Sequence, residues 1–366
     1  MIRYKIVILA FILLNTTVHS IKGQEQEKNI YLQAYEKINE MLEDKLSSNF
    51  KYAVFTVEKA YVSNSSKEEL VNQELEILFS LIKETSFSNF SYKGKDEEIV
   101  TKQATIFKFL NDTIVIPVDS AQLFIHTPYT YDFSDPFGEK DWTKMFVSKL
   151  LETGKGNCHS LPYLYKILAD ELGIPAYLAF APNHIYIKSY SEKTGWYNTE
   201  LTSGTFPIDA WIMASGYVTL EAIQNGLYMD TLSNKQAVAN CLVDLAQGYQ
   251  RKFGKDNSDF VIKCCNTCLE YHPVNVNAML TKAEAQKHYI LKQMETKKLK
   301  KPQDLFSDVS IKEMYEDMEQ TYVKLHQLGY RRMPEEMYLQ WMNSLRNEPT
   351  KYNNPKVSVN KKRNKN

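Results

Sequence analysis

The 366-residue sequence lacks an excess of either charge, because 44 basic side chains stand against 44 acidic ones. It is also poor in glycine, proline and cysteine, with 13, 12 and 5 residues respectively. Collagen-like and low-complexity disordered chains are therefore excluded, and a net charge of zero gives no general case for nucleic-acid binding. With 43% hydrophobic residues, the chain is long enough for two or three globular domains.

Long apolar runs are also missing, apart from one short stretch at the N-terminus. Arg3 and Lys5 precede nine apolar residues, 6–14, which are too few to cross a bilayer. Small residues follow, so we predict that residues 1–20 are a secretory signal peptide, with cleavage as late as Gly23. The sequence therefore predicts an exported protein, periplasmic or extracellular, with no stable membrane span.

Helical periodicity dominates both flanks of the chain. Residues 24–112 repeat apolar side chains at spacings of three and four, which predicts a helical N-terminal region. The helical period returns over 233–346, where patterns beginning at Leu242 and Leu280 resemble tetratricopeptide repeats. One and a half repeats cannot bury a solenoid core, so we expect these tetratricopeptide-like helices to dock on the central domain. Residues 347–366 hold six basic side chains among asparagines, which predicts a disordered basic tail.

The segment between these helical regions, residues 113–232, contains both helical and alternating strand patterns, which predicts an α+β core. A helix is expected over 160–172, and alternating strands of an antiparallel hairpin over 184–190 and 196–201. Upstream, the aromatic, turn-rich run 129–137 is expected to be a loop. It either borders a functional cleft or is a surface loop pinned by its own aromatic contacts.

A cysteine stands where the predicted central helix begins. The run Gly154-Lys155-Gly156-Asn157-Cys158 leads into that helix, and its glycines allow a tight backbone. In the first helical turn, free amides and the positive end of the helix dipole favour a thiolate. Cys158 is therefore a candidate nucleophile. The alternative is a small buried residue at a helix start.

A nucleophilic cysteine needs a base, and the base needs an orienting partner. His184 opens the first strand of the predicted hairpin. If the hairpin turn pairs Tyr190 with Trp196, Glu200 becomes the diagonal neighbour of His184, within reach of a long side chain. The argument depends on this register, since a slip of one residue would send the two side chains to opposite faces. Glu200 is thus the group expected to orient the imidazole.

These residues together resemble the core of the transglutaminase-like superfamily, in particular SirB-type bacterial proteins with tetratricopeptide-like helices. The resemblance rests on Gly-Asn-Cys158, Pro-Asn-His184 and Trp-x-x-x-acid ending at Glu200, and is clearest over 155–202. It implies a papain-like fold in which Cys158 is the nucleophile, His184 the base and Glu200 the orienting acid, a position more often held by aspartate. The interval of 26 residues from Cys158 to His184 separates the chain from papain itself, where it is about 130.

The resemblance also implies a function. We expect cysteine-dependent acyl transfer or hydrolysis of a peptide or amide substrate through a thioester, with no metal or organic cofactor. Water as the acceptor would make the protein a peptidase or amidase, and an amine would make it a transamidase. Export points to a peptide or protein substrate of the cell envelope. The alternative is a non-catalytic peptide- or protein-binding module that retains the fold, and the reactivity of the thiol distinguishes the two.

A second group of cysteines suggests a metal site at first sight. Its members are Cys264, Cys265, Cys268 and His272. On a helix the consecutive residues Cys264 and Cys265 point about a hundred degrees apart, so the four cannot bind one tetrahedral zinc without breaking the helix. We expect small buried residues of a packed helix instead. If Cys158 is a free thiol, these three cysteines and Cys241 still allow three disulfide connectivities.

Overall fold

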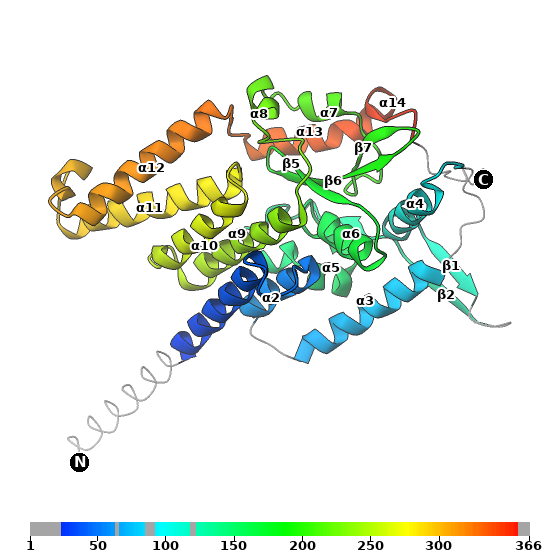
Figure 1. Cartoon of the computed structure of the whole chain (residues 1–366), viewed down its shortest axis with the longest axis horizontal. Coiled ribbons are helices and arrows are strands. Elements are labelled where there is room, and N and C mark those ends of the chain that lie inside the picture. The colour runs from blue at the N-terminus through cyan, green and yellow to red at the C-terminus, as the bar shows by residue number, and fades with distance from the viewer. Residues whose placement is uncertain (1–22, 63–65, 85–91, 118–121, 358–366) are drawn as a thin grey trace, which may run out of the picture.

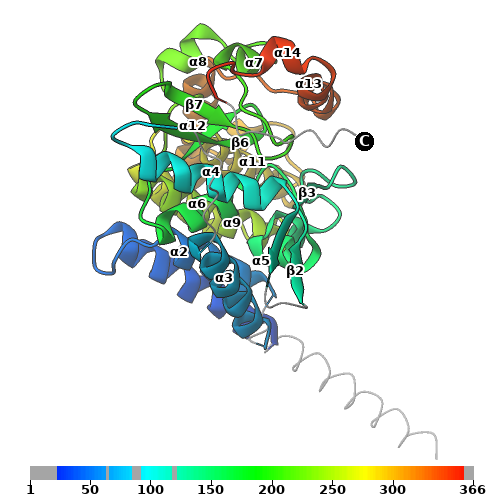
Figure 2. The same ribbon diagram turned by 90° about the vertical axis from the view of Figure 1, so that its right-hand side faces the viewer.

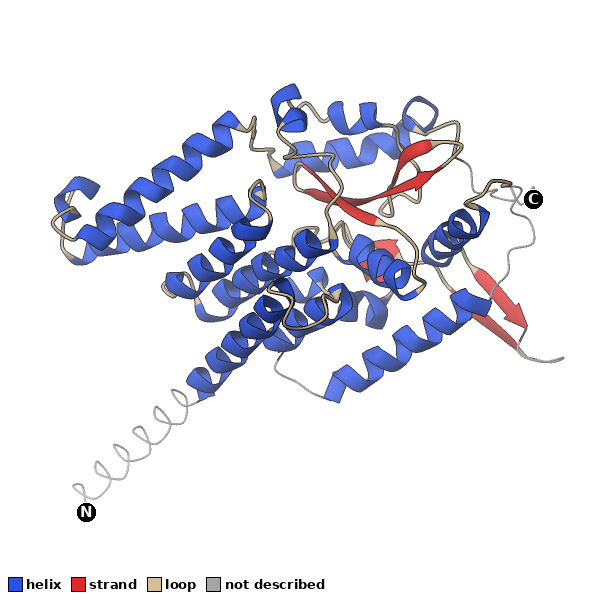
Figure 3. Ribbon diagram, viewed as in Figure 1, coloured by secondary structure: helices blue, strands red, loops and turns tan. Residues whose placement is uncertain are grey.

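Helices predominate in the structure, a computed structural model, and small β-sheets occupy the middle of the chain (Figure 1, Figure 3). This arrangement fits the predicted α+β class. The structure describes residues 23–62, 66–84, 92–117 and 122–357. The predicted signal peptide, residues 1–20, lies outside the described residues. Within the described part, no helix is both long and apolar enough to cross a membrane.

Among the described residues, four helices occupy the N-terminal region of helical periodicity. They are residues 23–42, α2 (Phe50–Val62), α3 (Ser66–Glu84) and α4 (Glu97–Asn111). The first of them buries Ala34, Ile38 and Met41, which recur at spacings of four and three, because these side chains form its apolar face. Helix α2 packs along a long helix of the C-terminal region, so both ends of the chain share one core.

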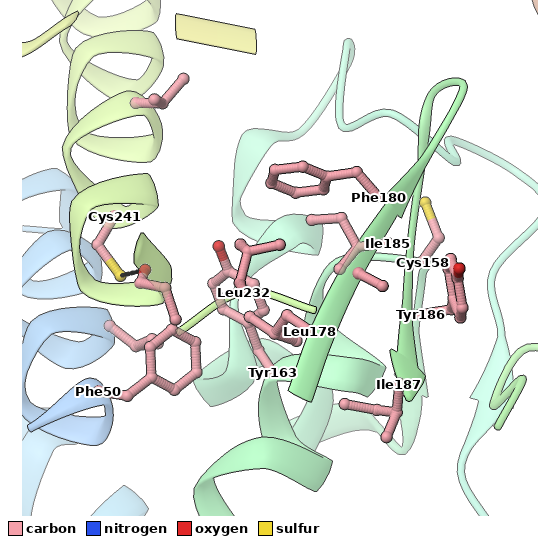
Figure 4. Close-up of a cluster of buried hydrophobic side chains, with 14 of the residues drawn as sticks. Phe50, Cys158, Tyr163, Leu178, Phe180, Ile185, Tyr186, Ile187, Leu232 and Cys241 are labelled. Carbon is pink, nitrogen blue, oxygen red and sulfur yellow. Dashed lines mark hydrogen bonds between the residues drawn. The ribbon is translucent and has the colours of Figure 1, made fainter. Parts of the chain in front are cut away.

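The centre of the fold is one helix against a three-stranded antiparallel sheet. These elements are α6 (Ser160–Glu171), β5 (Tyr177–Ala181), β6 (His184–Ser191) and β7 (Gly195–Thr199). Helix α6 is buried from Ser160 to Ala169, because the sheet, α4 and α5 (Val147–Thr153) all pack around it. Figure 4 shows part of this core, with Tyr163 of α6 and Leu178 and Ile187 of the sheet.

The sheet has the register that the sequence predicted. Ala181 pairs with His184, so a two-residue turn of Pro182 and Asn183 joins β5 to β6. Asn183 takes a positive φ of 56°, which asparagine tolerates well. In the next hairpin Tyr190 pairs with Trp196. The pairing directs His184 and Glu200 toward the same side of the sheet.

The described residues between α4 and α6 contain four short strands, and one of them lies within the run 129–137 that was expected to be a loop. Two short hairpin strands, β1 (Ile114–Pro117) and β2 (Leu123–His126), are antiparallel, whereas β3 (Thr130–Tyr131) pairs in parallel with β4 (Lys155–Gly156). The pairing of β3 with β4 brings the loop 129–137 beside the turn that carries Cys158. A 3₁₀ turn, η1 (Trp142–Met145), then leads into α5.

The C-terminal region consists of helices that pack on their neighbours in sequence. After the short helices α7 (Asp209–Met213) and α8 (Leu220–Gln224) come α9 (Asn234–Phe253), α10 (Ser258–Tyr271), α11 (Val276–Thr296), η2 (Pro302–Leu305) and α12 (Val309–Gln327). Each of the long helices contacts the next. Helices α11 and α12 extend away from the sheet (Figure 1) and share a small apolar cluster of their own.

The chain then returns to the sheet through two last helices, α13 (Glu335–Asn347) and α14 (Pro349–Tyr352). Figure 2 shows them at one end of the molecule with β7, and α2 and α3 at the opposite end. The side-chain Oδ1 of Asn353 accepts a hydrogen bond from the Phe206 amide at 3.1 Å. The Asn354 amide donates to the Phe206 carbonyl at 2.7 Å, and Pro207 and Asn353 form an isolated β-bridge. Because this backbone pairing holds the segment, the prediction of a disordered tail over 347–366 is wrong for residues 347–357.

Replacing Leu164 with alanine tests whether α6 is the core helix. The Leu164 side chain is fully buried, so we expect the free energy of unfolding to fall by about 2–5 kcal/mol. Urea denaturation followed by circular dichroism measures it. Leu70→Ala on α3 is the matched control, because Leu70 is 60% exposed and its loss should cost about 0.5 kcal/mol or less. Equal losses in the two variants would contradict the assignment.

Candidate functional site

Cys158 lies in a tight turn two residues before α6 begins, and not in its first helical turn as the sequence suggested. The Asn157 side chain shapes this turn, since its Oδ1 accepts from the amides of His159 at 3.0 Å and Ser160 at 3.1 Å. Gly156 is required just before it. A Cβ there would lie 2.7 Å from Ser160 Oγ and 2.8 Å from a Leu150 methyl group. The turn therefore presents Cys158 against the end of the sheet.

His184 and Glu200 are in direct contact, as the register predicted. His184 Nε2 lies 2.6 Å from Glu200 Oε2, and both side chains are at most 1% exposed. The other carboxylate oxygen, Oε1, accepts from the Thr202 amide at 2.9 Å and from its hydroxyl at 2.6 Å. The longer glutamate side chain thus reaches the imidazole and has both oxygens satisfied.

Cys158 completes the group on the other side of the imidazole. Its Sγ lies 3.7 Å from the carbonyl oxygen of Asn183, the residue before His184, and His184 acts on the thiol in the direction that lowers its pKa. Because Nε2 is engaged by Glu200, only Nδ1 is available to the thiol, and it also lies 3.3 Å from the hydroxyl of Tyr338 on α13. The structure therefore brings all three predicted site residues together.

The electrostatics of this group favour a thiolate beside an imidazolium. Burial alone would raise the pKa of the Cys158 thiol, but the hydrogen bond and charge of His184 outweigh it and hold that pKa below its usual value. For His184, burial works against the cation, yet the Glu200 carboxylate and the thiolate raise its pKa to about 10. Both shifts stabilise the same ionised pair.

Two tyrosines that the sequence did not single out also belong to the site. The Tyr338 hydroxyl, from α13, lies 3.3 Å from His184 Nδ1 and 3.2 Å from the Tyr131 hydroxyl. The Phe137 ring packs on Tyr338 with ring centroids 5.0 Å apart, so the aromatic loop 129–137 does border the site. Tyr338 lies 154 positions from His184 in the sequence, and no local spacing links the two.

Helix α13 covers the site and leaves it almost closed to solvent. Cys158 is 5% exposed, His184 3% and Tyr338 0%. The Asn183 side chain donates to the Met333 carbonyl at 2.9 Å, which anchors the chain just before α13. Further along the helix, the Trp341 ring packs edge-on against His184 at 5.5 Å. A ligand reaches Cys158 only if this cover moves.

The other cysteines are buried helix residues with no disulfide, so none of the three possible connectivities is formed. Burial raises the pKa of the Cys265 thiol to about 12 and those of Cys241, Cys264 and Cys268 well above the usual value. His272 stacks on Phe180, and burial lowers its pKa to about 4. The described residues contain no group of three or more histidine, cysteine or carboxylate side chains placed to hold a metal ion. Cys158 is thus the one cysteine whose surroundings favour ionisation.

Comparisons with protein-family models, with curated proteins and with solved structures each found no match.

Replacing Glu200 with glutamine should neutralise the imidazole. Without the carboxylate, Cys158 alone opposes the effect of burial and the pKa of His184 falls from about 10, so that at about pH 8 the ring loses a proton that it otherwise keeps. ¹⁵N NMR of histidine-labelled protein reports this directly. Glu192→Gln, at the exposed turn between β6 and β7, is the control and should leave His184 unchanged. A doubly protonated His184 in Glu200→Gln would contradict the assigned role of the carboxylate.

Proposed function

We propose that the chain is an exported cysteine-dependent acyl-transfer enzyme with a transglutaminase-like, papain-like core. The observation that carries the proposal is the buried group in which Glu200 contacts His184 at 2.6 Å and Cys158 contacts the residue before His184 at 3.7 Å. The order of elements agrees with it, because the thiol precedes a central helix while the base and the acid come from successive strands. A cysteine kept only for packing needs no buried ion pair beside it.

The chemistry follows from the charges. The Cys158 thiolate attacks the carbonyl carbon of an amide, and the C–N bond breaks as the His184 Nδ1 proton passes to the leaving amine. A thioester to Cys158 remains. Water or a primary amine then attacks it, gives a proton to His184 and releases the thiolate with the acid or the new amide. Glu200 stays ionised throughout and holds the ring in place.

The turn before α6 also supplies a donor for the developing oxyanion. Asn157 Oδ1 already occupies the amides of His159 and Ser160. Within the described residues the amide of Cys158 has no acceptor, so we assign it to the oxyanion. This role matches the geometry of a nucleophile that lies at the start of a helix.

The substrate class is a peptide or protein encountered outside the cytoplasm. The basic start and apolar stretch of residues 1–20 support export through a signal peptide. A substrate from the cell envelope fits that location. The helices α9 to α12, with their tetratricopeptide-like pattern, offer additional surface beside the core for such a partner.

One observation favours a second candidate, a non-catalytic module that holds a peptide or protein. Cys158 is only 5% exposed under α13, as a structural residue would be. The low pKa of its thiol argues for catalysis instead, because a buried thiol without a function is ordinarily neutral. Covalent chemistry at Cys158 separates the two functions.

The direct test is an adduct on Cys158. Purified protein incubated with an envelope extract, or with amide peptides and a primary amine, is expected to form a thioester or a specific product detected by mass spectrometry. Cys158→Ala and His184→Gln should each lose about 10³-fold or more in rate. Cys241→Ala is the matched control because its thiol is buried and protonated. Equal adduct formation in His184→Gln and the unaltered protein would overturn the acyl-transfer function.

Catalysis through Cys158 also requires that α13 open. We predict that Tyr338→Ala, which removes the ring over the site, raises the iodoacetamide alkylation rate of Cys158 by about tenfold or more, since a large buried contact is lost. Peptide mass spectrometry follows the rate. Met337→Ala is the control, because Met337 is the neighbouring residue and is 40% exposed. An unchanged rate in Tyr338→Ala would mean that Tyr338 does not limit access.

A further inference from the structure

A second histidine follows the candidate nucleophile directly and is held between two oxygen atoms. His159 Nδ1 lies 2.8 Å from the Met145 carbonyl oxygen. Its Nε2 lies 3.1 Å from Asp244 Oδ1 of α9. The contact between His159 Nε2 and Asp244 Oδ1 is close but is not aligned as a hydrogen bond. We therefore describe it as an ion pair.

This environment fixes the protonation of His159. A backbone carbonyl and a carboxylate are both acceptors only, so each ring nitrogen is satisfied only when it carries a proton. A neutral ring would place a nitrogen lone pair against one of the two oxygens. The charge of Asp244 and the Met145 carbonyl outweigh the effect of burial and raise the pKa of His159, in agreement with this geometry. The geometry and the raised pKa both favour the imidazolium form of His159.

Asp244 is itself held in place by a buried polar chain. The Tyr163 hydroxyl donates to Asp244 Oδ2 at 2.9 Å and accepts from the Asn240 amide at 2.8 Å. The Asn240 carbonyl oxygen accepts from Asn275, the residue that caps α11, at 2.9 Å. The carboxylate opposite His159 is thus positioned by three helices, α6, α9 and α11.

We infer that His159 and Asp244 are positioning residues for Cys158, with the His159 imidazolium stabilising the thiolate as a second cation besides His184. The inference rests on the proposed acyl-transfer function. The charge of His159 acts on Cys158 in the direction that lowers the pKa of the thiol. Asp244 acts through His159, so a residue of the C-terminal helical region influences the pKa of the Cys158 thiol.

Four titratable groups lie against His159 or act on its charge. Besides Asp244, they are Cys158, the Tyr163 ring at a centroid distance of 4.0 Å, and Glu58 of α2. Glu58 accepts from the amides of Val147 and Ser148, and burial raises its pKa to about 7. Of these, Asp244 alone is in direct ionic contact with the ring.

Measuring the pH at which the Cys158 thiol ionises tests the inference, and it does not require a reagent to reach the buried thiol. The thiolate absorbance in the ultraviolet, corrected by subtraction of Cys158→Ser, gives the pH midpoint for Cys158. His159→Gln removes the cation, and Asp244→Asn lets His159 lose its proton, so each is expected to move this midpoint upward by roughly half a pH unit. Asp317→Asn is the matched control, since it also loses an ion pair, with Lys282 at 2.7 Å, but lies on α12.

A purely structural role of the pair would lower the melting temperature of Asp244→Asn but leave the midpoint in place, and that result would overturn the inference. If Asp244→Asn does not fold, His159→Gln and ¹⁵N NMR of His159 in the unaltered protein decide, and a neutral His159 near pH 7 overturns the inference. The His184→Gln variant distinguishes a failure of this inference from a failure of the proposed acyl-transfer function. A large shift in His184→Gln with none in the other variants refutes only this inference, whereas no shift in His184→Gln refutes the proposed function itself.

Discussion

The contact between His184 and Glu200 is the interaction on which the rest of the site depends. It joins a base and an acid at 2.6 Å in an environment that water barely reaches. An imidazolium in such a place needs a fixed anion, and Glu200 provides it while Thr202 satisfies its second oxygen. This cation is the group that contributes most to lowering the pKa of the Cys158 thiol. The sheet register, the Asn183 turn and the packing of α6 all serve to keep these three side chains at one place.

Much of this arrangement was predictable, because it depends on local patterns. Strand alternation and turn length determined that His184 and Glu200 share a side of the sheet, and the glycine-rich turn located Cys158. Tyr338 was not predictable. It reaches the site through the return of α13 across the molecule, and amphipathic helix patterns show that a face is buried without showing against what.

The C-terminal half therefore does more than flank the core. Helix α13 covers the site with Tyr338 and Trp341, and α9 supplies Asp244 to the turn that holds Cys158. Residues 347–357 were expected to be disordered because they are polar and basic, yet backbone pairing with Phe206 orders them. The amino-acid composition of a segment indicates how much conformational entropy is lost when it becomes ordered. It does not show the backbone hydrogen-bond partners that offset this loss, because they lie far away in the sequence.

The account's central claim is that Cys158 and His184 form an ionised pair in the folded protein. The most direct measurement is the ultraviolet thiolate absorbance of the unaltered protein minus that of Cys158→Ser, followed from acidic to alkaline pH. We expect the thiolate signal to appear at a lower pH than that of a free cysteine and to be lost on acidification. A Cys158 thiol that ionises at or above the pH of a free cysteine would contradict the account.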